Sequence, residues 1–176
     1  MYIILFLAAV FFGLAAANFY VAFSYPLKYQ DYVGKYSNEF GVDKAMIYSI
    51  MRAESSFDPK AVSRSGAIGL MQLMPSTALM LAYELGIQDF TTEMLFDPEI
   101  NIRLGTCYYG KMLKKFENYE TALAAYNAGE GNVSSWLSNP EYSKDGKTLD
   151  YIPFKETSNY IKKINKNYKI YKIRIK

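Results

Sequence analysis

One glutamate has the setting of a group that does acid–base chemistry. Glu54 follows Ile47 by seven positions and Ile50 by four, so in a helix its carboxyl shares the apolar stripe rather than the hydrated face. Burial, and a place in the last helical turn at the negative end of the helix dipole, both raise a carboxyl pKa. A carboxylic acid that stays protonated near neutral pH suits glycosidic cleavage, because the leaving oxygen must receive a proton. A structural glutamate paired with Arg52 or a loop amide is the alternative.

The amino-acid composition leaves acid–base chemistry to carboxylates. The 176-residue chain has no histidine, which excludes Ser-His-Asp and Cys-His arrangements and zinc sites of the HExxH type. Its single cysteine, Cys107, allows no intrachain disulfide and is expected to be a small buried apolar residue. The glycine patterns of nucleotide-binding loops are missing from the sequence. We therefore predict neither a metal nor an organic cofactor.

A glycine-containing segment follows the predicted Glu54 helix. Gly66 and Gly69 bracket the small-residue stretch SGAIG, where a backbone could approach a ligand closely. Gln72 and Met74 come just after it. An ordinary flexible connection that ends in a core methionine is the alternative interpretation.

Two further positions are candidates for a site. Tyr126 and Asn127 lie in AAYNAG at a predicted helix end beside a glycine, a pattern that is also typical of a capped core helix. Glu156 precedes Tyr160 by four residues, so we expect it on the inward face of the last helix. Two inward-facing glutamates in one small helical domain indicate a polar cavity, although a salt bridge to a lysine is the simpler account of either.

Helix start and stop signals recur after residue 25, whereas strand signals are nearly absent. Residues 139–153 are rich in turn formers, with a tight turn expected at Asp145 and Gly146. We therefore predict an all-α domain with long loops and one core. Its expected helices run from the N-cap Asp43 to Glu54, from Pro75 to Gly86, from Asp97 and Pro98 to about Phe116, over TALAAYNA to Gly129, and from about Phe154 with Tyr160, Ile161, Ile164 and Tyr168 as apolar face.

The N-terminal segment has the composition of a membrane span. Residues 1–25 carry no charged side chain and exceed the ~20 apolar residues that a bilayer requires. We predict an uncleaved anchor, followed by a domain over residues 26–176. A signal peptide cleaved after Ala15–Ala17 is the alternative, but no Lys or Arg precedes the apolar run and hydrophobicity resumes at Phe19. Lys28 follows the segment, a charge bias that taken alone argues against export.

The C-terminal region is strongly basic. From Lys155 to Lys176 the chain has eight Lys or Arg residues and one acid, within a net charge of +3. A solvated helix face is one explanation, and attraction of Lys162, Lys163 and Lys166 to an anionic wall or membrane surface is the other. We expect no nucleic-acid partner.

Four ordered blocks resemble a known family over roughly residues 27–170. Together they are similar to the lytic transglycosylase domain of bacterial cell-wall enzymes, which has a lysozyme-like fold. The GEG at 129–131 replaces a more usual GPG and affects only a local turn. The blocks are ESSFDPKAVSRSGAIGLMQLMPSTA, DPEINIRLGTCYY, ALAAYNAGEGNV and IPFKETSNYIKKI.

The resemblance implies roles for individual residues. Glu54 matches the family's only catalytic acid, and Tyr126 matches a tyrosine that hydrogen-bonds this acid. Ser63 falls where the family often has a serine near the acetamido groups of the substrate. The expected substrate-binding residues are Ser63, Gln72, Met74, Tyr126, Asn127 and Glu156.

The resemblance also implies a reaction and a location. The family cleaves the bond between N-acetylmuramic acid and N-acetylglucosamine without water and leaves 1,6-anhydro ends. We expect a monomer that acts on glycan strands, held by one membrane span with its domain outside the cytoplasm. A hydrolytic muramidase, with Asp58 or Glu156 as a second acid, and a non-catalytic wall-binding module are the alternatives.

Overall fold

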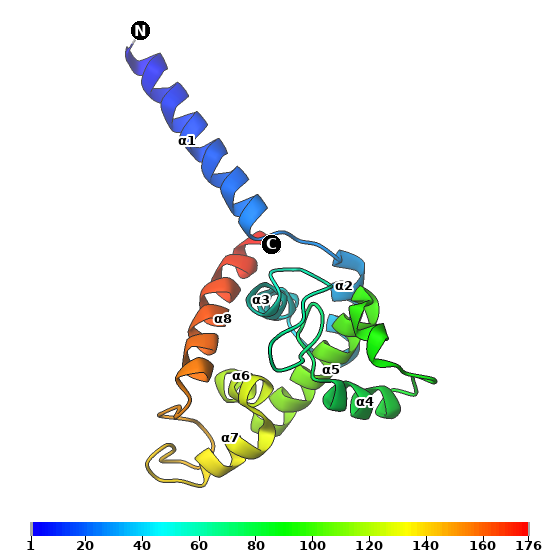
Figure 1. Ribbon diagram of the computed structural model, residues 1–176. Coiled ribbons are helices and arrows are strands. Elements are labelled where there is room, and N and C mark those ends of the chain that lie inside the picture. Colours follow the sequence, from blue (N-terminus) through cyan, green and yellow to red (C-terminus); the bar gives the residue numbers. More distant parts are fainter. Residues whose placement is uncertain (1, 176) are drawn as a thin grey trace.

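The computed structural model describes residues 2–175, and its regular elements are helices joined by loops (Figure 1). Met1 and Lys176, the outer ends of the predicted anchor and domain, lie outside the described residues. Extended pairing between residues 2 and 175 is limited to the isolated bridges Val62–Ile68 and Ile68–Leu73, so the all-α prediction is confirmed. The helices are α1 Tyr2–Ser24, α2 Gln30–Phe40, α3 Lys44–Glu54, α4 Pro75–Glu84, α5 Pro98–Phe116, α6 Tyr119–Ala128, α7 Glu130–Leu137 and α8 Lys155–Arg174, with a 3-10 turn η1 at Thr92–Phe96.

Capping residues place the predicted helices correctly. The Asp43 side chain accepts the N–H of Ala45 at 2.8 Å, and α3 starts at the next residue. Asp97 does the same for the N–H of Ile100 ahead of α5, whose first residue is Pro98. These local signals are short-range, and they fix the helix starts to within a residue.

Two helices, α2 and α7, and the turn η1 were not predicted. The α2 sequence contains Gly34 and begins after Tyr29, whose side chain makes no capping hydrogen bond. The α7 sequence EGNVSSWL contains poor helix formers. Both are stabilised by burial of a few side chains, among them Val133 and Trp136 of α7, which is a tertiary effect.

The helix α3 lies at the centre of the domain. Every residue from Ala45 to Met51 is buried, and Ile47, Ile50 and Met51 are completely enclosed. The long helix α8 packs along α3, while α5 packs against α2 and α6 (Figure 1). Glu54, the last residue of α3, is therefore held by a helix that is packed on several sides.

Helix α1 projects away from the domain (Figure 1). Its 23 residues include an 18-residue window with a mean hydropathy of 2.2, and none of the described residues in this window is buried against the domain. By length and composition α1 can therefore cross a membrane. The helix continues without interruption through Ala15–Ala17, the alternative cleavage site.

Candidate active site

The chain makes a strained turn directly after Glu54. Ser56 and Phe57 both have left-handed backbone conformations, with φ of 54° and 67°. Such conformations cost non-glycine residues of order 1–3 kcal/mol each and persist only where the surroundings enforce them. Here the Phe57 ring is buried beside Tyr48, and the Ser55 hydroxyl donates to the carbonyl of Leu70 at 2.8 Å. The carboxyl end of α3 is thereby tied to the following loop.

Asn101 of α5 holds the loop between residues 68 and 71. Its side chain is completely buried and donates to the carbonyls of Ile68 and Leu95, each at 2.9 Å, while its oxygen accepts the N–H of Met71 at 2.8 Å. One amide thus forms hydrogen bonds with three backbone groups, two in the loop and one in the turn η1.

Gly69, expected to let the backbone approach a ligand, instead lies close to other parts of the protein. A Cβ at this position would lie 2.2 Å from the Asn101 amide nitrogen and 2.4 Å from the Leu95 carbonyl oxygen, and its φ is +81°. The close neighbour is therefore the protein itself, not a ligand. On α5, Gly105 plays a similar part, because a Cβ there would lie 2.5 Å from the Met71 sulfur.

The expected hydrogen bond from Tyr126 to Glu54 is not what the structure shows. The Tyr126 hydroxyl donates to the carbonyl of Met71 at 2.7 Å. Asn101 holds the Met71 backbone in place by accepting its N–H, and the Met71 carbonyl accepts the hydrogen bond from the Tyr126 hydroxyl of α6. The ring of Tyr126 is buried beside Tyr108 and Tyr109. This burial, together with the nearby charge of Glu54, raises the pKa of Tyr126.

The Glu54 carboxyl combines partial solvent access with a raised pKa. Burial raises its pKa from 4.5 to about 7, and the charge of Glu156 adds to the rise. The hydroxyl of Tyr160 and the charge of Lys163 oppose it. The Tyr160 hydroxyl faces the carboxyl but makes no hydrogen bond of ordinary geometry within residues 2–175. At neutral pH, Glu54 therefore exists in both protonation states.

Lys163 belongs to the site rather than to a free basic face. Its ammonium donates to the carbonyl of Ala53, in the last turn of α3. The negative end of the α3 dipole stabilises a cation at this position. All three lysines expected to attract an anionic surface are exposed, and Lys162 and Lys166 do not make this contact.

Glu156 is exposed, contrary to the expectation of an inward-facing position on α8. It lies in the first turn, and its neighbour Thr157 is buried instead. The Thr157 hydroxyl donates to the side-chain oxygen of Asn127 at 2.8 Å. Glu156 lines the polar hollow beside Asn127, and its charge acts on Glu54, so the expected polar cavity is present although Glu156 itself is not buried.

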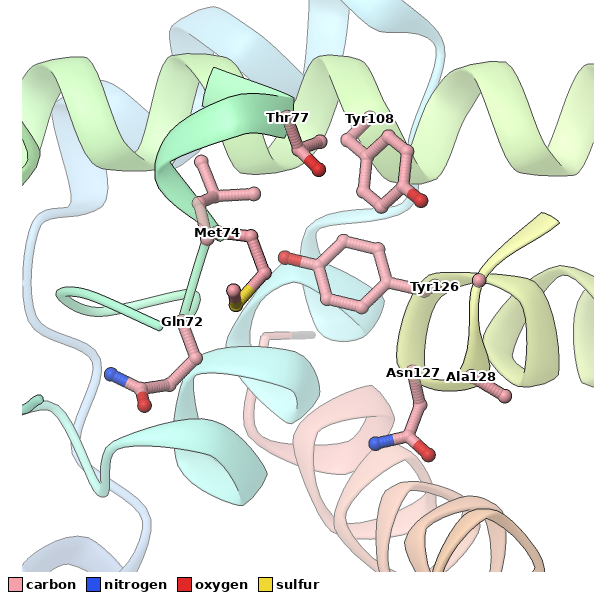
Figure 2. Close-up of a pocket in the computed structure, with 9 residues that line it drawn as sticks. Gln72, Met74, Thr77, Tyr108, Tyr126, Asn127 and Ala128 are labelled. Carbon is pink, nitrogen blue, oxygen red and sulfur yellow. The ribbon is translucent and has the colours of Figure 1, made fainter. Parts of the chain in front are cut away.

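Two hollows open around the end of α6. The first, of about 240 Å³, lies between the segment 72–77, Tyr108 and α6 (Figure 2). Figure 2 shows the Tyr126 hydroxyl pointing from α6 toward this segment, with Gln72 and Asn127 on opposite sides. The second hollow, of about 590 Å³, is lined by Ser65, Asn127, Ala128 and the stretch 153–157.

The structure brings together most of the expected site residues. Asn127 lines both hollows, the charge of Glu54 raises the pKa of Tyr126 in the first, and the charge of Glu156 in the second raises the pKa of Glu54. Gln72 lines the first hollow but donates its amide to the carbonyls of Ala61 and Gly69, so it also braces the loop. Met74 and Tyr126 are the other expected residues there.

Two of the expected residues, Glu54 and Ser63, are not in the lining of either hollow. Ser63 braces the loop instead. Its hydroxyl accepts the N–H of Ala67 at 2.9 Å, and its own N–H donates to the Ala67 carbonyl. The side chain thus closes the turn around Gly66. Of the seven expected site residues, Ser63 has the clearest structural role.

Sequence reasoning missed several contributors to the site. Asn101 and Tyr108 both belong to the block DPEINIRLGTCYY, which gave no chemical signal beyond the resemblance. Tyr160 was assigned to the apolar face of its helix, and its buried hydroxyl beside Glu54 was not anticipated. A polar group on an apolar stripe, as in Tyr160, was the available signal.

The arrangement can deliver and remove one proton at an open polar cleft. Glu54 is the group with the suitable pKa, and the two hollows, lined by its electrostatic neighbours Tyr126 and Glu156, provide space for a ligand nearby. Among residues 2–175 there is no group of three or more Cys, Asp or Glu side chains placed to hold a metal ion.

Comparisons with known proteins agree with this geometry. A family model described as "Transglycosylase SLT domain" matches residues 31–149. The soluble lytic murein transglycosylase of Salmonella typhimurium is 38% identical over 143 residues, covering 80% of this chain and 22% of the relative. The membrane-bound lytic murein transglycosylase C of Edwardsiella ictaluri is 33% identical, covering 82% of this chain and 46% of the relative.

Solved structures show the same fold. The 70 kDa soluble lytic transglycosylase of Escherichia coli in complex with bulgecin A aligns with a TM-score of 0.78 and 32% identity, over 88% of this chain and 26% of that one. An inactive glutamate-to-glutamine mutant of the lytic transglycosylase Slt from Pseudomonas aeruginosa aligns with a TM-score of 0.75 and 33% identity, over 86% and 25%. The chain spans about a quarter of the length of these proteins.

Proposed function

The chain belongs to the transglycosylase SLT domain family, and on that premise we propose that it is a peptidoglycan lytic transglycosylase. It cleaves the β-1,4 bond between N-acetylmuramic acid and N-acetylglucosamine and leaves 1,6-anhydro-muramic acid ends. Because the chain spans only part of its relatives, this activity is proposed for the domain itself.

The observation that carries the proposal is the environment of Glu54. Its pKa of about 7 allows one carboxyl to act first as an acid and then as a base at neutral pH. In the first step the protonated carboxyl gives its proton to the glycosidic oxygen while the bond to the anomeric carbon breaks. The carboxylate then takes the proton of the muramic acid 6-hydroxyl as that oxygen bonds to the same carbon. The proton returns to Glu54, and no water is consumed.

A second carboxylate nucleophile is not needed in this scheme. Glu156 is the one other acid whose charge affects the pKa of Glu54, and it is exposed at the opening of α8. A retaining hydrolase would hold its two carboxyl groups about 5–5.5 Å apart across the scissile bond. The enclosed position of Glu54 and the open position of Glu156 favour a single catalytic carboxyl.

We assign the glycan strand to the two hollows. Gln72, Met74 and Tyr126 contact sugars in the first, Glu156 contacts them in the second, and Asn127 reaches both. Ser63 contributes through the loop turn that it closes. The relatives give support, since one of them is inactive as a glutamate-to-glutamine mutant and another binds bulgecin A.

We also propose a location and a domain division. Residues 1–25 form a single membrane span, and residues 26–176 form a domain outside the cytoplasm, where peptidoglycan lies. The apolar helix α1 and the membrane-bound relative support this placement. One chain supplies all the residues assigned to the cleft, so a monomer suffices for activity.

Mass spectrometry of the sugars released from purified peptidoglycan tests the proposal, with Glu54→Gln run in parallel. Muropeptides that end in 1,6-anhydro-muramic acid, absent with the variant, are expected. Reducing ends would mean a muramidase that uses water. Binding without release would mean a non-catalytic wall-binding module.

A further inference from the structure

The segment between α1 and α2 is packed onto the domain rather than free. Tyr25, Leu27 and Tyr29 are partly buried against the core, and Lys28 is the exposed residue among them. Tyr29 turns the chain with a left-handed φ of 58°. A flexible tether would show none of this packing, so the end of α1 and the domain are held together.

Aromatic contacts join this segment to α3 and α8. The Tyr25 ring lies edge-on to Tyr171 at 5.6 Å, and Tyr171 stacks on Tyr48 at 5.3 Å. The Tyr171 hydroxyl donates to the carbonyl of Pro26 at 3.4 Å, and the Arg52 guanidinium lies 5.6 Å from the centre of the Tyr25 ring. The last turns of α8 therefore lie beside the end of α1, as Figure 1 shows.

Cations outnumber acids at this end of the domain. Lys172 pairs with Asp43 at 2.8 Å. Arg52 and Arg174 are half-buried, and Lys28 and Lys169 are exposed. Ile173 is 76% exposed within the same turn of α8. The cations are Lys28, Arg52, Lys169, Lys172 and Arg174, and the acids are Asp31, Asp43 and Asp58.

The proposed cleft lies at the opposite end of α8. From Tyr171 back to Glu156 the helix rises about 1.5 Å per residue, which amounts to about 20 Å along its axis. Figure 1 shows α6, α7 and the start of α8 on the side of the domain away from α1. A surface that rested on a membrane next to α1 would therefore point the cleft away from it.

We propose that the end of the domain formed by Lys28, Arg52 and the last two turns of α8 is a membrane-contact surface for acidic phospholipid headgroups. Lys28 and Arg174 meet the lipid phosphates, Ile173 enters the headgroup layer, and the packed tyrosines fix the angle between α1 and the domain. The cleft is then held at a set height above the bilayer, facing the glycan strands. This inference rests on the proposed insertion of α1 in a membrane and is independent of the proposed reaction.

The full chain, reconstituted into vesicles, tests this surface. A nitroxide label at Ile173→Cys reports contact through relaxation by a nickel-chelating lipid, with a label at Lys162→Cys on the same helix as control. The native Cys107 is only 6% exposed and reacts little with the label, and unsubstituted protein measures that background. Relaxation is expected at 173 and not at 162, and only in phosphatidylcholine vesicles that contain phosphatidylglycerol.

Charge reversal identifies the cations that make the contact. Lys28→Glu combined with Arg174→Glu should reduce the ratio of contacting to free domain by more than about tenfold, since each cation near an acidic surface contributes about fivefold. Lys162→Glu combined with Lys166→Glu changes the charge equally, away from the surface, and should have little effect. Salt at about 1 M should also release the domain of the unsubstituted protein from the lipid surface, while α1 stays inserted.

Three results would overturn the inference. The first is equal relaxation at 173 and 162, the second is equal relaxation with and without phosphatidylglycerol, and the third is an equal effect of the two reversal pairs. Failure of the full chain to float with vesicles would remove the membrane insertion of α1 and this surface together. The release of anhydro-muropeptides in detergent would still stand, so the two proposals are separable.

Discussion

Glu54 closes α3 and Glu156 opens α8, and the two helix ends give the same side chain different surroundings. At the end of α3 the carboxyl is largely enclosed and lies at the negative end of a helix dipole, and its pKa rises to about 7. At the start of α8 the carboxyl is exposed and lies at the positive end of a dipole, which favours a negative charge. The surroundings, more than the residue type, decide which glutamate can hold a proton at neutral pH.

The loops beside these glutamates differ in the same way. The loop 55–74 is irregular and strained, yet Asn101 of α5 and Tyr126 of α6 hold its backbone from neighbouring elements. The loop 138–154 is held mainly by its own residues, such as the Asp145 carboxylate, which accepts the N–H groups of Lys147 and Thr148. A site that needs an enclosed acid therefore depends on long-range braces, whereas its rim depends on local turns.

Neutralising each glutamate gives the largest expected difference. Glu54→Gln should lower the rate of anhydro-muropeptide release by about 10²- to 10⁴-fold, because it removes the proton donor and acceptor. Glu156→Gln should lower it by less than about tenfold, as expected for a residue that contacts the sugar. Rates are measured on purified peptidoglycan, with circular dichroism as a control for folding. An equal loss in both variants would contradict a single catalytic carboxyl.

Removing one brace from each loop should separate their stabilities. Asn101→Ala leaves the Met71 N–H and the Leu95 carbonyl without partners. It also removes one of two hydrogen bonds to the Ile68 carbonyl, so it should reduce the free energy of unfolding by about 2–4 kcal/mol. Asp145→Ala removes an exposed turn contact and should shift the midpoint of urea unfolding only slightly. Similar midpoints for the two variants would show that the loop 55–74 is not held through Asn101.

The raised pKa of Glu54 should also appear in the stability of the domain. The folded state holds the Glu54 proton more tightly than the unfolded chain, in which the pKa of this carboxyl is near 4.5. The folded state therefore loses stability as the pH rises from about 4.5 through about 7. Glu54→Gln has no carboxyl to ionise, and above pH 7 it should be more stable than the natural sequence by about 1–3 kcal/mol. Urea unfolding at pH 5 and pH 8 measures the difference. A constant difference at both pH values would argue against a raised pKa.

The smallest expected effect comes from Tyr160→Phe. The Tyr160 hydroxyl lowers the pKa of Glu54, so its removal should move the alkaline limb of the activity profile to higher pH. Because this buried hydroxyl faces the Glu54 carboxyl without a hydrogen bond of ordinary geometry within residues 2–175, its loss should cost little stability. The dependence of kcat/KM on pH measures the shift. A fall in activity at every pH without a shift would assign Tyr160 a packing role only.

Local sequence signals predicted α3, α4, α5 and α8 well because caps and prolines act over a few residues. The same signals are weak in α2 and α7, which burial stabilises, and these helices were missed. Burial of Cys107 was predicted correctly. Helical periodicity did not predict the exposure of Glu156, because it reports which side of a helix a residue occupies but not how far neighbouring elements cover that residue.

The sequence by itself determined the all-α class, the apolar N-terminal helix and the place of Glu54 on an inward stripe, because these follow from composition and short spacings. The tertiary structure alone decided which groups surround the Glu54 carboxyl. It directed the Tyr126 hydroxyl to Met71 and placed Tyr160 and Lys163 beside the acid. These contacts join residues far apart in the chain, and the pKa of a buried group depends on such neighbours and on the water they exclude.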